Sequence, residues 1–89
     1  MRAKFDYKGH SVVVERGLQG AKLLIDDKLC AEKKGAFSVQ FVNFDLNGEI
    51  QNTDGTIDAI RISVRIGLTQ DDVIFFCNGK EIESTKVRA

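Results

Sequence analysis

Apolar and polar residues alternate along much of the chain with the two-residue period of a β-strand. Residues 1–8 place Ala3, Phe5 and Tyr7 on one face. Residues 57–68 alternate over a longer stretch. There the apolar residues Ile60, Ile62, Val64, Ile66 and Leu68 are expected to point inward, and Arg61, Ser63 and Arg65 outward. This alternation predicts strands with one buried face and one exposed face.

Other segments add further strands. Residues 11–15 contain three consecutive valines. Residues 36–44 alternate through Phe37, Val39 and Phe41 and then change phase at Val42 and Phe44, which predicts a β-bulge or a bend. Residues 73–77 form a continuous apolar run, typical of a strand covered on both faces. Residues 80–84 are expected to return as the second arm of that hairpin.

Dipeptides ending in glycine provide the breaks between these segments. Asn47-Gly48, Asp54-Gly55 and Asn78-Gly79 each favour a type I′ turn, which needs positive φ at both central residues. Proline is absent, and no stretch has the composition of a linker. Three such dipeptides in a short chain predict an all-β fold.

Residues 14–34 fit a second interpretation. Val14, Leu18, Ala21, Ile25 and Leu29 follow the spacing of one helical face, and Gly35 could end a helix there. Gly17 and Gly20 oppose a helix, because each costs about 1 kcal/mol relative to alanine. A strand pair and a helix therefore both remain open from these residues alone.

A weak internal repeat favours strands in this region. At an offset of 52 positions, Val12, Val14, Leu24 and Lys28 align with Val64, Ile66, Phe76 and Lys80. Asp26-Asp27-Lys28 then matches Asn78-Gly79-Lys80, so each unit contains a strand, a short loop, a strand, a tight turn and a strand. Because the second unit has a clear β pattern, the first is predicted to be β as well.

Parts of both units resemble the repeated unit of Fas apoptosis inhibitory molecule. In that family a strand of the form His-x-aliphatic-Glu-aromatic-Glu meets a hairpin ending in Val-Asp-Gly-Lys. Residues 10–17 and 20–28 are similar to it, and residues 62–83 look similar through their Asn-Gly-Lys turn. Asp27 replaces the turn glycine, and the family's aromatic residues around the first hairpin are missing here. The resemblance implies a non-catalytic antiparallel β-sandwich that acts through contacts with other proteins.

These patterns together predict one domain over residues 1–89, a small antiparallel β-sandwich of seven or eight short strands. The chain has 89 residues, of which 43% are apolar and 29% charged. The formal net charge is zero, but residues 1–44 hold eight Lys/Arg against five Asp/Glu, and residues 45–89 hold five against eight. This asymmetry suggests two halves that face each other, within one chain or across a dimer.

Composition also bears on compartment and partners. A neutral chain lacks the basic excess that supplies most of the affinity for nucleic acids or anionic membranes, so neither partner is expected. No apolar stretch resembles a signal peptide or a transmembrane span. Cys30 and Cys77 lie in apolar surroundings, and we expect buried thiols in a cytoplasmic protein.

Few residues suggest catalysis. His10 is the single histidine, and a catalytic triad would need it beside a nucleophile and a carboxylate. Ser11 and Asp6 are near in sequence, but neighbours on a strand point to opposite faces, so an exposed turn histidine is expected. His10, Cys30 and Cys77 lack the spacing of a zinc site. We therefore predict no catalytic residues, no cofactor and no metal ligands.

The polar region 45–58 is the best candidate for a ligand site. It begins like a calcium loop, but Ile50 and Thr56 occupy the positions that need glycine and glutamate. Asn52, Asp54 and Asp58 leave a looser oxygen-ligand site open, although turn geometry also explains them. The charge pairs Lys33-Lys34 and Asp71-Asp72 are expected to be solvated turn residues.

The functional prediction follows from these exclusions. The chain is expected to be a non-enzymatic protein-interaction or structural module, with self-association through edge strands as one form of it. The alternative is a small-ligand or metal-binding module that uses the polar 45–58 loop.

Overall fold

The computed structural model describes residues 1–35 and 43–88, and the described residues form eight antiparallel strands and no helix. The strands are β1 (Arg2–Tyr7), β2 (His10–Gly17), β3 (Gly20–Ile25), β4 (Lys28–Lys34), β5 (Asn43–Gln51), β6 (Ile57–Arg65), β7 (Gln70–Cys77) and β8 (Lys80–Arg88). The predicted all-β fold is confirmed, and residues 14–34 form strands. The predicted phase change in residues 36–44 falls mostly on 36–42, outside the described residues.

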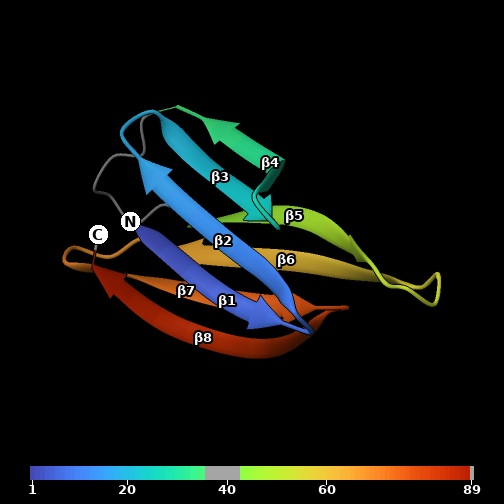
Figure 1. Cartoon of the computed structure of the whole chain (residues 1–89). Helices are drawn as coiled ribbons and strands as arrows, with labels where there is room; N and C mark the ends of the chain where they lie inside the picture. Colours follow the sequence, from blue (N-terminus) through green and yellow to red (C-terminus); the bar gives the residue numbers. More distant parts are fainter. Residues whose placement is uncertain (36–42, 89) are drawn as a thin grey trace.

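The strands form two four-stranded sheets, each in the order in which its strands occur along the chain. We name β1–β4 the N-sheet and β5–β8 the C-sheet; Figure 1 shows them as two stacked layers. Residues 1–35 hold eight Lys/Arg and five Asp/Glu, and residues 43–88 hold five and eight. The charge asymmetry of the sequence therefore corresponds to the two sheets, which face each other within one chain.

Alternating apolar side chains from both sheets fill the space between the layers. The largest fully buried side chains include Phe5, Leu23, Ile60, Ile62 and Phe75. The rings of Phe5 and Phe75 meet across the layers with centroids 5.4 Å apart. Burial of this apolar surface stabilises the sandwich by about 25 cal/mol per Å².

Two predicted burial patterns need correction. Leu68 is 73% exposed, because β6 ends at Arg65 and side chains in the loop that follows no longer alternate between the two faces of a sheet. In β7, Val73, Phe75 and Cys77 point into the core, whereas Ile74 and Phe76 lie on the outer face, where Ile74 is buried and Phe76 half-buried. No further sheet of the described residues covers that face; Arg61 places its guanidinium 4.1 Å from the Phe76 ring centroid.

The predicted turns have three different outcomes. Asn78-Gly79 joins β7 to β8 with φ of 53° and 81°, as a type I′ turn requires. Asp54-Gly55 lies in a wider loop, where Gly55 has positive φ and Asp54 does not. Asn47-Gly48 is not a turn at all, since it lies inside β5. A Cβ on Gly48 would lie 3.3 Å from Cβ of Cys30, so glycine allows β5 to approach the N-sheet closely.

The internal repeat is real, but one offset does not describe it. The β-bulge between Leu23 and Leu24 recurs between Phe75 and Phe76, which confirms an offset of 52 for the last two strands of each sheet. In contrast, the pair Val12↔Ile25 corresponds to Ile60↔Cys77, an offset of 48 for the earlier strand. The predicted match of Val12 with Val64 is therefore wrong. The cause is the longer stretch between the last paired residues, because residues 66–71 separate Arg65 from its partner Asp72, whereas only residues 18–19 separate Gly17 from Gly20.

Candidate functional site

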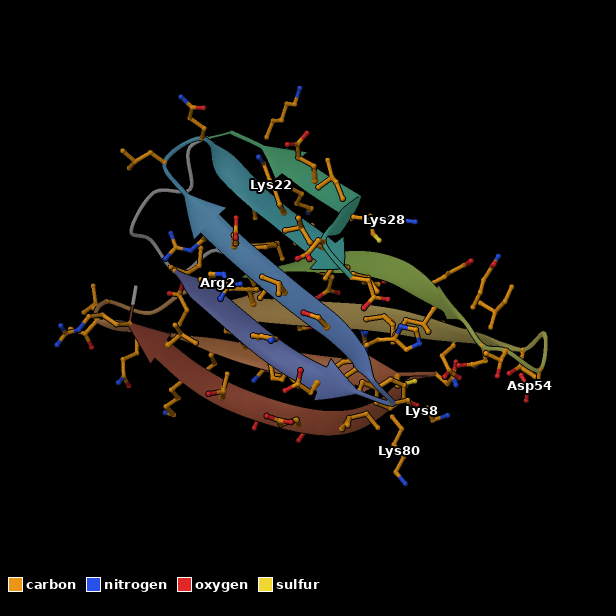
Figure 2. The ribbon with its side chains drawn as sticks, viewed as in Figure 1. Arg2, Lys8, Lys22, Lys28, Asp54 and Lys80 are labelled. Atoms are coloured by element: carbon orange, nitrogen blue, oxygen red, sulfur yellow. The ribbon has the colours of Figure 1, made fainter. Side chains whose placement is uncertain are left out.

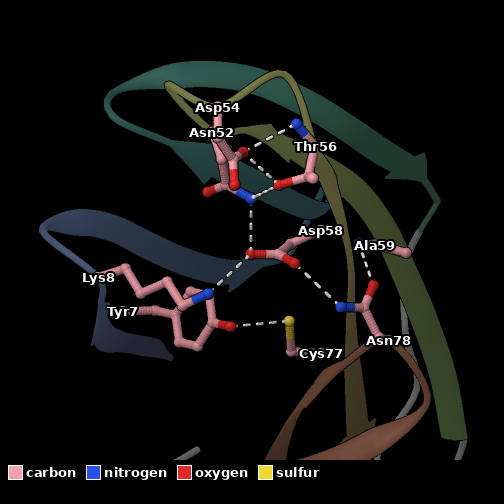
Figure 3. A network of polar contacts seen from close by, with 9 residues as sticks. All are labelled: Tyr7, Lys8, Asn52, Asp54, Thr56, Asp58, Ala59, Cys77 and Asn78. Carbon is pink, nitrogen blue, oxygen red and sulfur yellow. Dashed lines mark hydrogen bonds and ion pairs between the residues drawn. The ribbon is translucent and has the colours of Figure 1, made fainter.

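A cluster of polar side chains around Asp58 joins three turns at one end of the sandwich (Figure 3). Asp58 lies on β6 and is only 7% exposed. Its Oδ1 accepts a hydrogen bond from Nδ2 of Asn78 at 3.0 Å, and its Oδ2 accepts one from Nδ2 of Asn52 at 3.2 Å. Lys8 places its ammonium 3.5 Å from Oδ2. Asp58 thus connects the β1–β2 turn of the N-sheet to two turns of the C-sheet.

The β5–β6 loop is held by its own polar groups. Asp54, near the tip of this loop in Figure 2, accepts hydrogen bonds from the backbone N–H and the hydroxyl of Thr56, at 3.0 and 2.6 Å. Asn52 donates to the Thr56 hydroxyl at 3.0 Å. The hydrogen bonds from the hydroxyl and the backbone N–H of Thr56 lower the pKa of Asp54 below its ordinary value, as those from Asn78 and Asn52 do for Asp58.

The predicted ligand region 45–58 therefore does not form one open oxygen site. Asp45 lies apart on the outer face of the C-sheet, where it accepts a hydrogen bond from Ser63 at 2.6 Å. The carboxylates of Asp54 and Asp58 already accept two or more hydrogen bonds or ionic contacts each. Among residues 1–35 and 43–88, no three His, Cys, Asp or Glu side chains are arranged to hold a metal ion.

A buried thiol extends the cluster into the core. Cys77 donates a hydrogen bond to the Tyr7 hydroxyl at 3.2 Å, and the Tyr7 ring meets Phe75 edge-on at 5.5 Å. The bond from Cys77 and burial raise the pKa of Tyr7, while Tyr7 and Asp58 raise the pKa of Lys8. The cluster thus fastens the two sheets together.

Protonation of Asp58 should make the folded state less stable at low pH. Its folded-state pKa is lowered, first by the hydrogen bond from Asn78 and then by that from Asn52. The stabilisation that ionised Asp58 gives the folded state is therefore complete above the unfolded-state pKa of about 3.9. It is lost as the pH falls through the lower folded-state pKa. We expect the stability difference between the wild type and Asp58→Asn to shrink between pH 6 and pH 2, measured by urea unfolding. Parallel stability curves for the two proteins would contradict this assignment.

His10 occupies the position in the N-sheet that Asp58 occupies in the C-sheet. It is half-buried, not an exposed turn histidine, because its Nδ1 lies 2.6 Å from Oδ2 of Asp26. Asp26 also accepts a hydrogen bond from the backbone N–H of Ser11, just as Asn78 accepts one from Ala59. Asp26 and Asn78 are the first residues of equivalent turns, and each is bonded to a residue near the start of a neighbouring strand. His10 therefore has a structural role, because its contact with Asp26 holds this turn in place.

The first of these turns should become more stable with glycine. Asp27 has φ of 66°, in the left-handed region, where the equivalent residue is Gly79 with φ of 81°. A non-glycine residue in this region costs about 1–2 kcal/mol, partly offset by the greater freedom of glycine in the unfolded chain. Asp27→Gly is therefore expected to raise the free energy of unfolding by about 0.5–1 kcal/mol in urea titrations. The matched change Gly79→Asp should lower it, and equal stability of all three proteins would refute the argument.

The two cysteines have different environments, and neither forms a disulfide. Cys77 is buried, as predicted, but Cys30 is exposed on β4. The reason is the repeated bulge, because Cys30 is the extra residue between Leu29 and Ala31 and lies at the edge of the N-sheet. The prediction of two buried thiols is wrong for Cys30.

A buried ion pair joins the sheets at the opposite end. Nε and Nη2 of Arg16 donate to Oδ2 of Asp71 at 2.9 and 2.6 Å. The side chain of Asp71 is fully buried and that of Arg16 is 14% exposed. Asp71 was predicted to be a solvated turn residue, but it is an inward-facing residue of β7. Alternation with Val73 and Phe75 was the signal that could have placed it in the core.

The strand edges are the most accessible candidate interface. β1, β4, β5 and β8 are the terminal strands of their sheets, so each has one side without a hydrogen-bonded strand among the described residues. No residue of β4 is buried, and Leu29 on this strand is 56% exposed. Such an edge presents backbone donors and acceptors to another extended chain. Edge strands with this exposure are places where a further strand can add.

No protein-family model matches the chain, and neither a curated protein nor a solved structure shows significant similarity to it. The resemblance to the repeated unit of Fas apoptosis inhibitory molecule therefore stays a prediction. Within the part of the chain that the structure describes, no helix has the length and apolarity needed to cross a bilayer.

Proposed function

We propose that this chain is a non-enzymatic protein-interaction module that binds its partners through exposed strand edges. The observation that carries the proposal is β4, a seven-residue edge strand with no buried residue. An extended segment that adds to such an edge gains main-chain hydrogen bonds, and the flanking side chains then select the partner.

The polar clusters support an interaction role over catalysis or ligand binding. Asp58 and Asp26 both accept hydrogen bonds from within the chain. These bonds link each carboxylate to residues in or next to neighbouring turns. Their contacts stabilise the turns that hold the strands in place. The sandwich is thus a scaffold, and its chemistry for recognition lies at the edges. The exposed thiol of Cys30 suits a reducing compartment, so the proposal places the module in the cytoplasm.

Comparison of two variants tests this proposal. The wild-type chain, Lys33→Glu/Lys34→Glu on the β4 edge and Lys22→Glu on the outer face of the N-sheet are immobilised separately. Each is exposed to a cell lysate and to the purified chain itself. We expect the wild type and Lys22→Glu to retain the same protein, and the β4 variant to retain much less of it. Binding that survives the β4 change, or no binding by any of the three, would overturn the proposal.

A further inference from the structure

The two open sides of the sandwich differ in charge. On one side β4 lies beside β5, and on the other β1 lies beside β8 (Figure 1). β4 carries three lysines and one glutamate, a balance of +2, whereas β5 carries Asp45 and Glu49 with no cation, a balance of −2. β1 has two cations and one anion, and β8 has three and two, so both are +1. Among the described strands, only the β4–β5 side has two edge strands of opposite sign.

We propose that a second copy of the chain binds at the β4–β5 side, so that β4 of each copy pairs with the Asp45–Gln51 part of β5 in the other. This proposal rests on the proposed function and identifies the partner. The opposite signs make the pairing favourable at both contacts. Pairing of β4 with a second β4 would instead bring lysines together, and pairing of β5 with a second β5 would bring carboxylates together.

The arrangement of the strands allows both contacts to form at once. β4 belongs to the N-sheet and β5 to the C-sheet, and they run in opposite directions in Figure 1. The axis of this dimer would be a two-fold parallel to the strands, located at the β4–β5 side and midway between the two layers. It places the C-sheet of one copy next to the N-sheet of the other. Each β4 then meets an antiparallel β5, and each four-stranded sheet continues into a sheet of the second copy. Such an interface is closed, because the same surface is used on both copies.

The β4–β5 side is also accessible. A shallow pocket of ≈ 550 Å³ is lined by Cys30 on β4, Gly48 on β5 and neighbouring residues, and a second of ≈ 210 Å³ lies between Asp26 and Gln51. Figure 2 shows Lys28, at the start of β4, pointing away from the sandwich. Leu29 follows it on the outer face, beside Leu24. Pairing with a further strand would shield Leu29 from water.

Charged residues on an edge strand also discourage aggregation, and this role alone would explain the lysines of β4. The acidic β5 on the same side separates the two explanations. If the charges served only to prevent aggregation, each edge strand should repel the edge strands of other copies. Instead, β4 of one copy has the opposite charge to β5 of another and attracts it. The two explanations therefore predict different responses to charge reversal.

A charge-swap experiment tests the inference on the full chain. Lys33→Glu/Lys34→Glu makes β4 acidic, and Asn47→Lys/Glu49→Lys makes β5 basic while leaving Asp45 with Ser63 and Arg61. All four positions are exposed, and circular dichroism checks that both variants keep the fold. Sedimentation velocity at low salt, over a range of concentrations, then measures the dimer Kd. Glu81→Lys/Glu83→Lys on β8 is the matched control.

We expect a wild-type dimer whose Kd rises with salt, and a Kd about tenfold or more higher for each variant alone. An equal mixture of the two variants should dimerise again, because each β4 then meets a β5 of opposite sign. The β8 control should dimerise like the wild type. A monomeric wild type, or a mixture that stays monomeric, would overturn the inference. If a monomeric wild type still retains another protein through β4, the proposed function stands and only the dimer inference fails. If it retains no protein, the proposed function and the dimer inference both fail.

Discussion

Gly20→Ala should lower the free energy of unfolding by about 3 kcal/mol or more, or prevent folding altogether. Gly20 has φ of 141°, a conformation that side chains with a Cβ rarely adopt. A Cβ built there would overlap the backbone carbonyl oxygen of Lys33 on the neighbouring strand. Backbone atoms cannot move aside as a flexible side chain can, so strain and overlap add together. Chemical unfolding followed by circular dichroism measures the loss.

Gly17→Ala is the matched control for this prediction. Gly17 pairs directly with Gly20 at the other end of the β2–β3 turn. A Cβ at Gly17 would meet no atom within 4 Å, and its φ lies outside the left-handed region. Alanine there should change stability by no more than about 0.5 kcal/mol in either direction. Similar losses for both variants would show that the turn tolerates no change, and that the close approach to Lys33 is not the cause.

Asp71→Ala is expected to lower the free energy of unfolding by about 3–5 kcal/mol, because it leaves the cation of Arg16 buried without its partner. The pair joins β2 to β7 across the two layers, with 55 positions between its residues. A domain of this size is stable by only about 5–10 kcal/mol, so much of the fold's stability depends on this contact. Urea unfolding at pH 7 measures the change.

Two further variants identify the cause of that loss. Glu15→Ala breaks the exposed ion pair with Arg2, at 3.4 Å, and should cost no more than about 1 kcal/mol. Arg16→Met/Asp71→Leu removes both charges and should be more stable than Asp71→Ala alone. If the double variant is as unstable as the single one, lost packing volume explains the effect, and the unpaired charge does not.

Strand periodicity was sufficient to predict the sandwich. Ala3, Phe5, Ile60 and Ile62 are buried as the alternation requires, and the match between Asp26-Asp27 and Asn78-Gly79 identified two equivalent turns. These signals are local, since each depends on residues close together in the sequence.

Features that depend on contacts between distant residues could not be predicted. Gly48 has the sequence of a turn, but it lies in a strand because the N-sheet passes close to it. Alternation with Val73 and Phe75 places Asp71 on the inner face, but its ion pair with the distant Arg16, which compensates that burial, has no signal in the sequence. Cys30 is exposed because of a bulge that no residue type specifies. The same holds for the edge strands, whose identity depends on the order of strands in each sheet.

The order of strands within each sheet has a consequence for how the chain folds. Every hydrogen-bonded pair among the eight described strands joins neighbours in the sequence, in both the N-sheet and the C-sheet. Each pairing therefore closes only a short loop, and the entropy lost before its contacts form is small. Sandwiches of the Greek-key type must bring together strands that are far apart in the chain, and they fold slowly for that reason. In this chain the pairing of strands is local, whereas the packing of the two sheets against each other brings distant residues together.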